Sequence, residues 1–110
     1  MTELSAIAIQ YFKDFSSKNI KTLKEHFSED ITLQDWEINA KGINEVIEAN
    51  KKIFDEVESI KVNPIQIIDN ENLLAAQLEI TINGKEVIHV VDILKFNENN
   101  KISSIRAYKG

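Results

Sequence analysis

The sequence contains no cysteine, which excludes disulfide bonds, thiolate metal ligands and a cysteine nucleophile. No apolar run approaches the ~20 residues of a membrane-spanning helix, and the first residues lack the basic-then-apolar pattern of a signal peptide. A basic excess is also missing, because 18 acidic residues outnumber 13 basic ones, which argues against nucleic-acid binding. We therefore expect a cytoplasmic protein that binds neither nucleic acid nor a membrane.

Motifs for cofactors and metals are absent as well. The 2 histidines have no metal-ligand spacing, and there is no glycine-rich phosphate loop, so the sequence predicts no metal and no cofactor. The chain has only 3 glycines and 1 proline, so most of it can lie in regular elements. Its 110 residues show no linker or repeat, which predicts a single domain over residues 1–110.

Hydrophobic periodicity divides the chain into two halves. In the first half, apolar residues recur at helical spacing over 4–15, 20–27 and 43–57, with a short alternating stretch at 31–36 between the second and third segments. In the second half the period is two, over 60–68, 74–82, 86–96 and 102–108. Asn83-Gly84 is a strong hairpin signal, and Pro64 indicates a bulge or an edge strand. The pattern predicts an α+β fold in the order α-α-β-α-β-β-β-β, with three N-terminal helices packed on a curved, mainly antiparallel sheet.

Four polar residues interrupt apolar faces of these predicted elements. Tyr11 lies in the middle of the first helical stripe, and Asn50 interrupts the third. Asp35 breaks the row that contains Leu33, and Asp92 lies in mid-strand between Val90 and Leu94. A buried carboxylate without partners costs several kcal/mol, so Asp92 should be protonated, hydrogen-bonded or both. The four together indicate a pocket inside the fold.

Each of these residues also has a purely structural interpretation. Tyr11 can be a core residue whose hydroxyl reaches the rim, and Asn50 can be a packing amide. Asp35 can be a turn residue at the end of a strand. Asp92 can be a carboxylate bonded to the backbone or to a lysine.

Two stretches of the chain, in the context of this order of elements, resemble a known family. They are residues 10–35, and residues 91–108, which read VDILKF, a turn and KISSIRAY. The sequence is similar to the ketosteroid-isomerase-like and SnoaL-like branch of the NTF2-like superfamily. The resemblance implies that Tyr11 and a neutral Asp92 form an oxyanion hole, and that Asp35 moves the proton. The ketosteroid isomerases are the established example of two carboxyl groups divided in this way.

The resemblance implies a cofactor-independent enzyme that transfers a proton next to the carbonyl of a small apolar molecule. The expected ligand-binding residues are Phe12, Phe15, Trp36, Asn50, Phe54, Val90 and Leu94. A homodimer is expected, because the opposite face of the strand 86–96 carries Val87, His89, Val91 and Ile93. The alternative is a non-catalytic ligand-binding or dimerisation module. Backbone hydrogen bonds to Asp35, or a cavity filled by Trp36, would favour that alternative.

Overall fold

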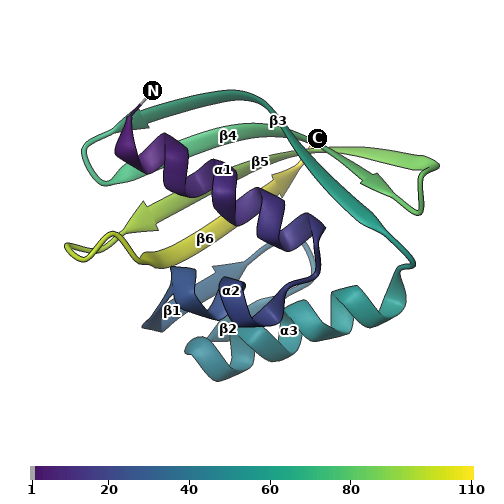
Figure 1. Ribbon diagram of the computed structural model, residues 1–110, viewed down its shortest axis with the longest axis horizontal. Helices are drawn as coiled ribbons and strands as arrows, with labels where there is room; N and C mark the ends of the chain where they lie inside the picture. The colour runs from purple at the N-terminus through teal and green to yellow at the C-terminus, as the bar shows by residue number, and fades with distance from the viewer. Residues whose placement is uncertain (1) are drawn as a thin grey trace.

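Three helices pack against one face of a six-stranded sheet in the computed structural model, which describes residues 2–110 (Figure 1). The helices are α1 (Glu3–Ser16), α2 (Ile20–His26) and α3 (Ile43–Glu56). The strands are β1 (Phe27–Gln34), β2 (Asn39–Lys41), β3 (Ile60–Asn70), β4 (Leu73–Ile82), β5 (Glu86–Phe96) and β6 (Ile102–Lys109). This α+β architecture confirms the predicted fold class.

The strands lie in the order β2-β1-β6-β5-β4-β3. All neighbouring pairs are antiparallel except β1 and β6, which are parallel. The predicted hairpin between β4 and β5 is present, with positive φ at Asn83 (56°) and Gly84 (67°). The β3–β4 register shifts between Pro64 and Gln66, which is the bulge that the proline indicated.

Two local predictions need correction. Strand β2 was not predicted, because three residues are too few to show an alternating pattern. Phe27 was assigned to the second helix, but it begins β1. Its apolar side chain suits the last turn of a helix and the first position of a strand equally well, so periodicity could not place the boundary.

Side-chain contacts fix the ends of the helices. The Asn19 Oδ1 atom accepts a hydrogen bond from the Thr22 backbone N–H (3.3 Å), as expected of an N-cap. The C-terminal end of α3 has no basic residue in its last turn. Lys18 instead reaches across from the α1–α2 connection, and its Nζ atom donates to the carbonyl oxygens of Phe54 (2.9 Å) and Val57 (2.7 Å). A distant cation therefore stabilises the carbonyl end of this helix.

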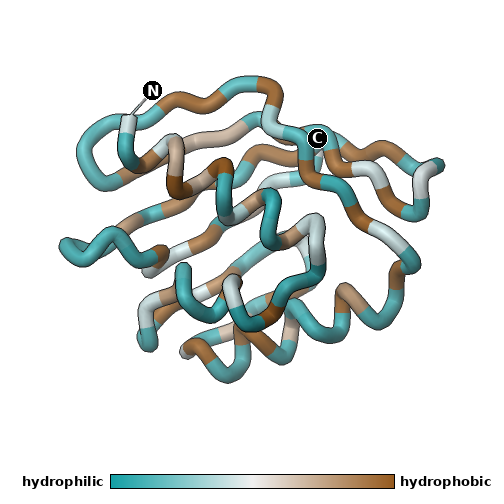
Figure 2. The backbone as a smooth tube through the Cα atoms, viewed as in Figure 1, coloured by the Kyte–Doolittle hydropathy of each residue, from teal (hydrophilic) through white to brown (hydrophobic). Residues whose placement is uncertain are grey.

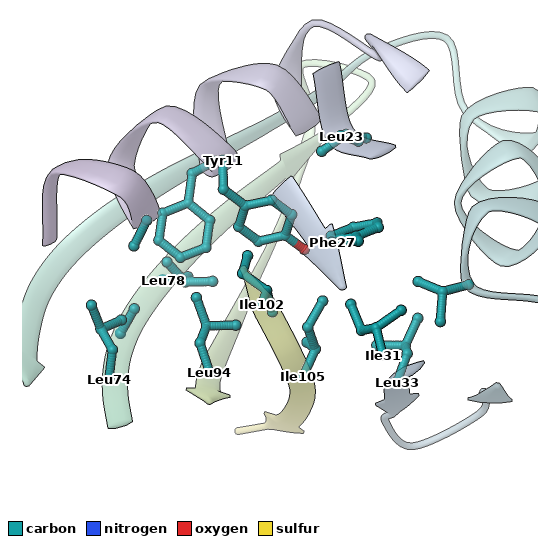
Figure 3. Packing of buried hydrophobic residues seen from close by; sticks show 14 of the residues in the cluster. Tyr11, Leu23, Phe27, Ile31, Leu33, Leu74, Leu78, Leu94, Ile102 and Ile105 are labelled. Atoms are coloured by element: carbon teal, nitrogen blue, oxygen red, sulfur yellow. The ribbon is translucent and has the colours of Figure 1, made fainter. Parts of the chain in front are cut away.

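The core fills the space between the helices and the inner face of the sheet. Polar and apolar positions alternate along the strands, as Figure 2 shows, so one face of the sheet is apolar beneath the helices. Figure 3 shows Leu74, Leu78, Leu94, Ile102 and Ile105 side by side on that inner face, below α1. The packing is not solid throughout, since a cavity remains between α1, α3 and the sheet.

Candidate functional site

A cavity of about 310 Å³ opens between the inner face of the sheet, α1, α3 and the turn after β1. Ligand pockets start at about this size. All four pattern-breaking residues line it: Tyr11 from α1, Asp35 from the end of β1, Asn50 from α3 and Asp92 from β5. Most other wall residues are aliphatic or aromatic. The structure thus gathers on one cavity the polar groups that the sequence singled out.

Asp92 lies at the floor of the cavity and is only 8% exposed. Its neighbours across the sheet are two small residues, Ala76 on β4 and Ala107 on β6. No backbone group or lysine within residues 2–110 bonds its side chain, so the purely structural interpretation has no support. Burial, together with the negative charge of Asp35, raises the pKa of Asp92 to about 7.

Tyr11 hangs from α1 with its hydroxyl directed away from the helix (Figure 3). Its ring is held by four aromatic neighbours at centroid distances of 5.3–6.2 Å, namely Phe12, Phe15, His26 and Phe27. Burial, with a further contribution from the Asp92 charge, raises the pKa of Tyr11 above its usual range. The hydroxyl therefore keeps its proton and remains a hydrogen-bond donor inside the cavity.

A side-chain hydrogen bond behind this cluster connects α1 to α2. His26 Nε2 lies 2.8 Å from Asp14 Oδ2, and both side chains are largely buried. Burial alone would raise the pKa of Asp14, but the hydrogen bonds from His26 and Gln10 outweigh it and lower that pKa. Since His26 also packs edge-on against Tyr11, the pair helps to fix the tyrosine ring.

Asp35 follows directly after β1 and is half-buried at the cavity. Its Oδ1 atom accepts hydrogen bonds from the backbone N–H groups of Glu37 (2.7 Å) and Ile38 (2.6 Å). This is the turn role that a strand-end aspartate often has. The Oδ2 atom has no hydrogen-bond partner in the described part of the chain, so the residue holds one oxygen fixed and one oxygen unengaged.

The predicted ligand-binding residues divide into two groups. Phe12, Phe15, Trp36, Asn50 and Val90 line the cavity. Phe54 and Leu94 do not, and their assignment is corrected to the core behind the wall. Phe54 turns aside to pack edge-on against Phe15 at 4.8 Å, and Leu94 lies one pleat beyond Asp92, where the core is closed.

Trp36 lies at the cavity mouth and is 45% exposed, so it does not fill the interior. β1 ends at Gln34, and the turn that follows brings both Asp35 and Trp36 to the cavity. The Nζ atom of Lys109 lies 5.8 Å from the centroid of the Trp36 ring, which is within the range of a cation–π contact.

Sequence reasoning missed much of the wall and all of the charged mouth. Val62, Leu78 and Ile80 line the cavity from β3 and β4, and their alternation along the strands was a usable signal. The mouth also carries Glu37, Glu56, Glu86 and Lys109. No local pattern distinguishes these four from ordinary surface charges, because they come from elements far apart in the chain.

Within residues 2–110, no group of three or more histidine, aspartate or glutamate side chains is arranged to hold a metal ion. None of the helices in that range is both long and apolar enough to cross a membrane.

Comparison with known proteins gives the family. The model of the SnoaL-like domain matches residues 8–105, which include Tyr11, Asp35, Asn50 and Asp92. The chain belongs to the SnoaL-like domain family. No curated protein matches the sequence.

Solved structures of the SnoaL-like and related families share the fold. A candidate isomerase of the SnoaL-like family from Agrobacterium tumefaciens has a TM-score of 0.87 at 12% identity, covering 100% of this chain and 99% of that one. A candidate SnoaL-like polyketide cyclase from Shewanella denitrificans also scores 0.87, at 14% identity and 100% and 92% coverage. A candidate ketosteroid isomerase from Kribbella flavida scores 0.82, at 14% identity and 97% and 77% coverage. At such identities these likenesses establish the NTF2-like fold and not the reaction.

Proposed function

We propose that this SnoaL-like protein catalyses proton transfer next to the carbonyl of a small apolar molecule held in the cavity. The observation that carries the proposal is the pairing of two buried donors on one cavity. Tyr11 keeps its proton, and Asp92, with a pKa near 7, is largely protonated below neutral pH. Neither group has a hydrogen-bond partner among residues 2–110, so both can donate to a ligand oxygen.

The steps follow from the positions of the three groups. The unengaged Oδ2 of Asp35 takes a proton from the carbon next to the carbonyl, and the electron pair of that C–H bond forms the enolate. Tyr11 and neutral Asp92 donate hydrogen bonds to the enolate oxygen, where the charge develops. Asp35 then returns the proton to another carbon. The apolar walls exclude water and strengthen both hydrogen bonds.

Turnover of small carbonyl compounds tests the proposal. We expect exchange of α-protons with D₂O and isomerisation of compact β,γ-unsaturated ketones, and weaker activity on steroids because Trp36 narrows the mouth. Tyr11→Phe should lower kcat by about 10²-fold or less, because Asp92 remains as a second donor. The control is Tyr108→Phe, an exposed tyrosine outside the cavity. Binding of these ketones without any exchange would contradict the proposal.

A second candidate function is a non-catalytic receptor for apolar ligands. It is favoured by the two backbone hydrogen bonds to Asp35 Oδ1, which give that residue a structural role. In this case Tyr11 and Asp92 would hold a ligand oxygen without any proton transfer. The exchange experiment separates the two functions, since a receptor binds the ketones and leaves their α-protons in place.

We further propose a homodimer formed through the outer face of the sheet. Val91 on β5 and its register partner Tyr108 on β6 are exposed there (39% and 58%), and Ile68, Ala75 and Ile93 form an adjacent row. Polar residues such as Gln77 and Glu79 lie on the same face of β4, which suits a mixed interface. A second copy of the chain presents the same patch and can cover it.

Sedimentation measures the association directly. We expect wild type to sediment as a dimer at micromolar concentration, and Val91→Asp, which places a charge in the centre of the patch, to sediment as a monomer. A wild-type monomer at that concentration would contradict the proposed interface.

A cytoplasmic location remains a prediction from the sequence.

A further inference from the structure

Asn50 is the one polar residue on the buried side of α3. The other buried residues of the helix are Val46, Ile47 and Phe54, all apolar. Asn50 is 3% exposed, and it lines the cavity that holds Tyr11 and Asp92. A buried amide at this position needs an explanation, because an aliphatic side chain would have no polar group to satisfy.

The amide nitrogen of Asn50 has no hydrogen-bond partner. Among residues 2–110, it is the single side-chain nitrogen or oxygen that is itself shielded from solvent and has no partner. Leaving a buried donor unpaired is strongly unfavourable, so such groups are rare in folded proteins unless they serve a function. The unpaired atom is a donor, and the group that would satisfy it is an acceptor.

An ordered water molecule explains this donor less well than a ligand does. A buried water needs two to four polar partners. The cavity residues one turn after Asn50 and at the C-cap of α3 are Ile53 and Val57, which offer no polar side-chain group. The carboxylate of Glu56 lies at the mouth, and Tyr11, Asp35 and Asp92 come from other elements of the lining. An oxygen atom carried into the cavity by an apolar ligand needs only the single donor.

We propose that Asn50 selects ligands with a second oxygen acceptor, apart from the carbonyl that Tyr11 and Asp92 hold. The inference deepens the proposed function and rests on it for the placement of the first oxygen. The two sites lie on different walls, since Asn50 comes from α3, whereas Tyr11 comes from α1 and Asp92 from β5. The substrate class is therefore a dioxygenated apolar compound, such as a hydroxyketone or a diketone, and not a simple ketone.

The specificity arises because only one of two ligand classes supplies an acceptor to the buried Asn50 donor. A dioxygenated ligand satisfies the Asn50 donor, whereas a simple ketone covers it with hydrocarbon and leaves it unpaired. Sites built to hydrogen-bond a ligand oxygen discriminate strongly against analogues that lack it. Leucine at this position would remove the donor while keeping the same branched arrangement of side-chain heavy atoms, and with the donor the reason for the discrimination would be lost.

Affinity measurements on a matched ligand series test the inference. The probes are a bicyclic enone and its congeners that carry one added hydroxyl or carbonyl oxygen at different ring positions. Calorimetry on wild type should show at least one congener binding ~10-fold or more tightly than the parent enone. Asn50→Leu should reduce that preference to within about twofold and bind the parent at least as well. Asn44→Leu, which replaces an exposed asparagine in the first turn of the same helix, should leave the preference unchanged.

Every outcome decides the inference. Equal affinities for all congeners in wild type, a preference that survives Asn50→Leu, or no binding to folded wild type would overturn it. An Asn50→Leu variant that loses affinity for the parent enone as well would place Asn50 on the first oxygen and also overturn it. The readout is binding, so failure of the proposed proton transfer is seen separately: selective binding without α-proton exchange would retain the Asn50 site and reject the reaction. A melting temperature for unliganded Asn50→Leu at or above that of wild type is the expected sign that the unpaired donor has been removed.

Discussion

Asp35→Asn is expected to lower the rate of α-proton exchange by about 10²–10⁴-fold, the usual effect of removing a general base. The substitution separates the two roles of the residue. An asparagine Oδ1 can still accept hydrogen bonds from the backbone N–H groups of Glu37 and Ile38, so the turn after β1 should persist. The amide that replaces Oδ2 has no basic oxygen to take a proton.

The measurement is deuterium incorporation into the ketone, followed by NMR for wild type and variant. Glu37→Gln is the matched control, because it removes a neighbouring carboxylate at the mouth and should leave the exchange rate nearly unchanged. Ligand affinity and the amide NMR spectrum of Asp35→Asn should remain close to those of wild type. Exchange that continues undiminished in Asp35→Asn would refute Asp35 as the base.

Asp92→Asn should make the protein more stable at pH 8 and leave its stability nearly unchanged at pH 4. The pKa of Asp92 is about 7 in the folded chain against an ordinary value of 3.8. Between these values the folded state holds a proton that the unfolded state has lost, so wild-type stability decreases as pH rises from about 4 to about 7 and then levels off. Each unit of pKa difference corresponds to about 1.4 kcal/mol, which gives a loss of a few kcal/mol.

Urea unfolding at several pH values measures this difference. Asparagine is neutral at every pH and nearly the same size as aspartate. The free energy of unfolding of the variant should therefore lack the decrease with pH that Asp92 causes in wild type. The difference in stability between variant and wild type should grow as the pH rises. Asp55→Asn, at an exposed position of α3, should follow the wild-type pH dependence. Parallel curves for wild type and Asp92→Asn would mean that Asp92 titrates normally, and the oxyanion-hole role would then be wrong.

Much of the fold follows from local patterns that are visible in the sequence. Helical spacing located α1 and α3, and alternation located β3 to β6, because one buried face per element imposes a period of 3.6 or 2 residues. The same logic found Tyr11, Asn50 and Asp92, since a polar residue in a buried row contradicts its own pattern. Pro64 and Asn83-Gly84 were informative because their backbone preferences are narrow.

The predictions that the structure corrected mostly concern the ends of helices and strands, where the hydrophobic periodicity stops. Strand β2 is too short to have a pattern, and Phe27 satisfies a helix and a strand alike. Strand alternation alone would put Asp35 and Trp36 on opposite sides, but β1 ends at Gln34 and the turn after it brings both residues to the cavity. Phe54 and Leu94 share a face with cavity residues, but the cavity does not extend along the whole of that face.

The sequence by itself determined which elements form, which face of each is buried and which polar residues are out of place there. These are local properties, set by side-chain size, polarity and backbone preference. Only the tertiary structure decided that β1 pairs in parallel with β6, that Lys18 stabilises the end of α3, and that Tyr11, Asp35, Asn50 and Asp92 line one cavity. Those features depend on contacts between residues tens of positions apart. The free energy of such contacts is set by tertiary packing, which the local sequence pattern does not contain.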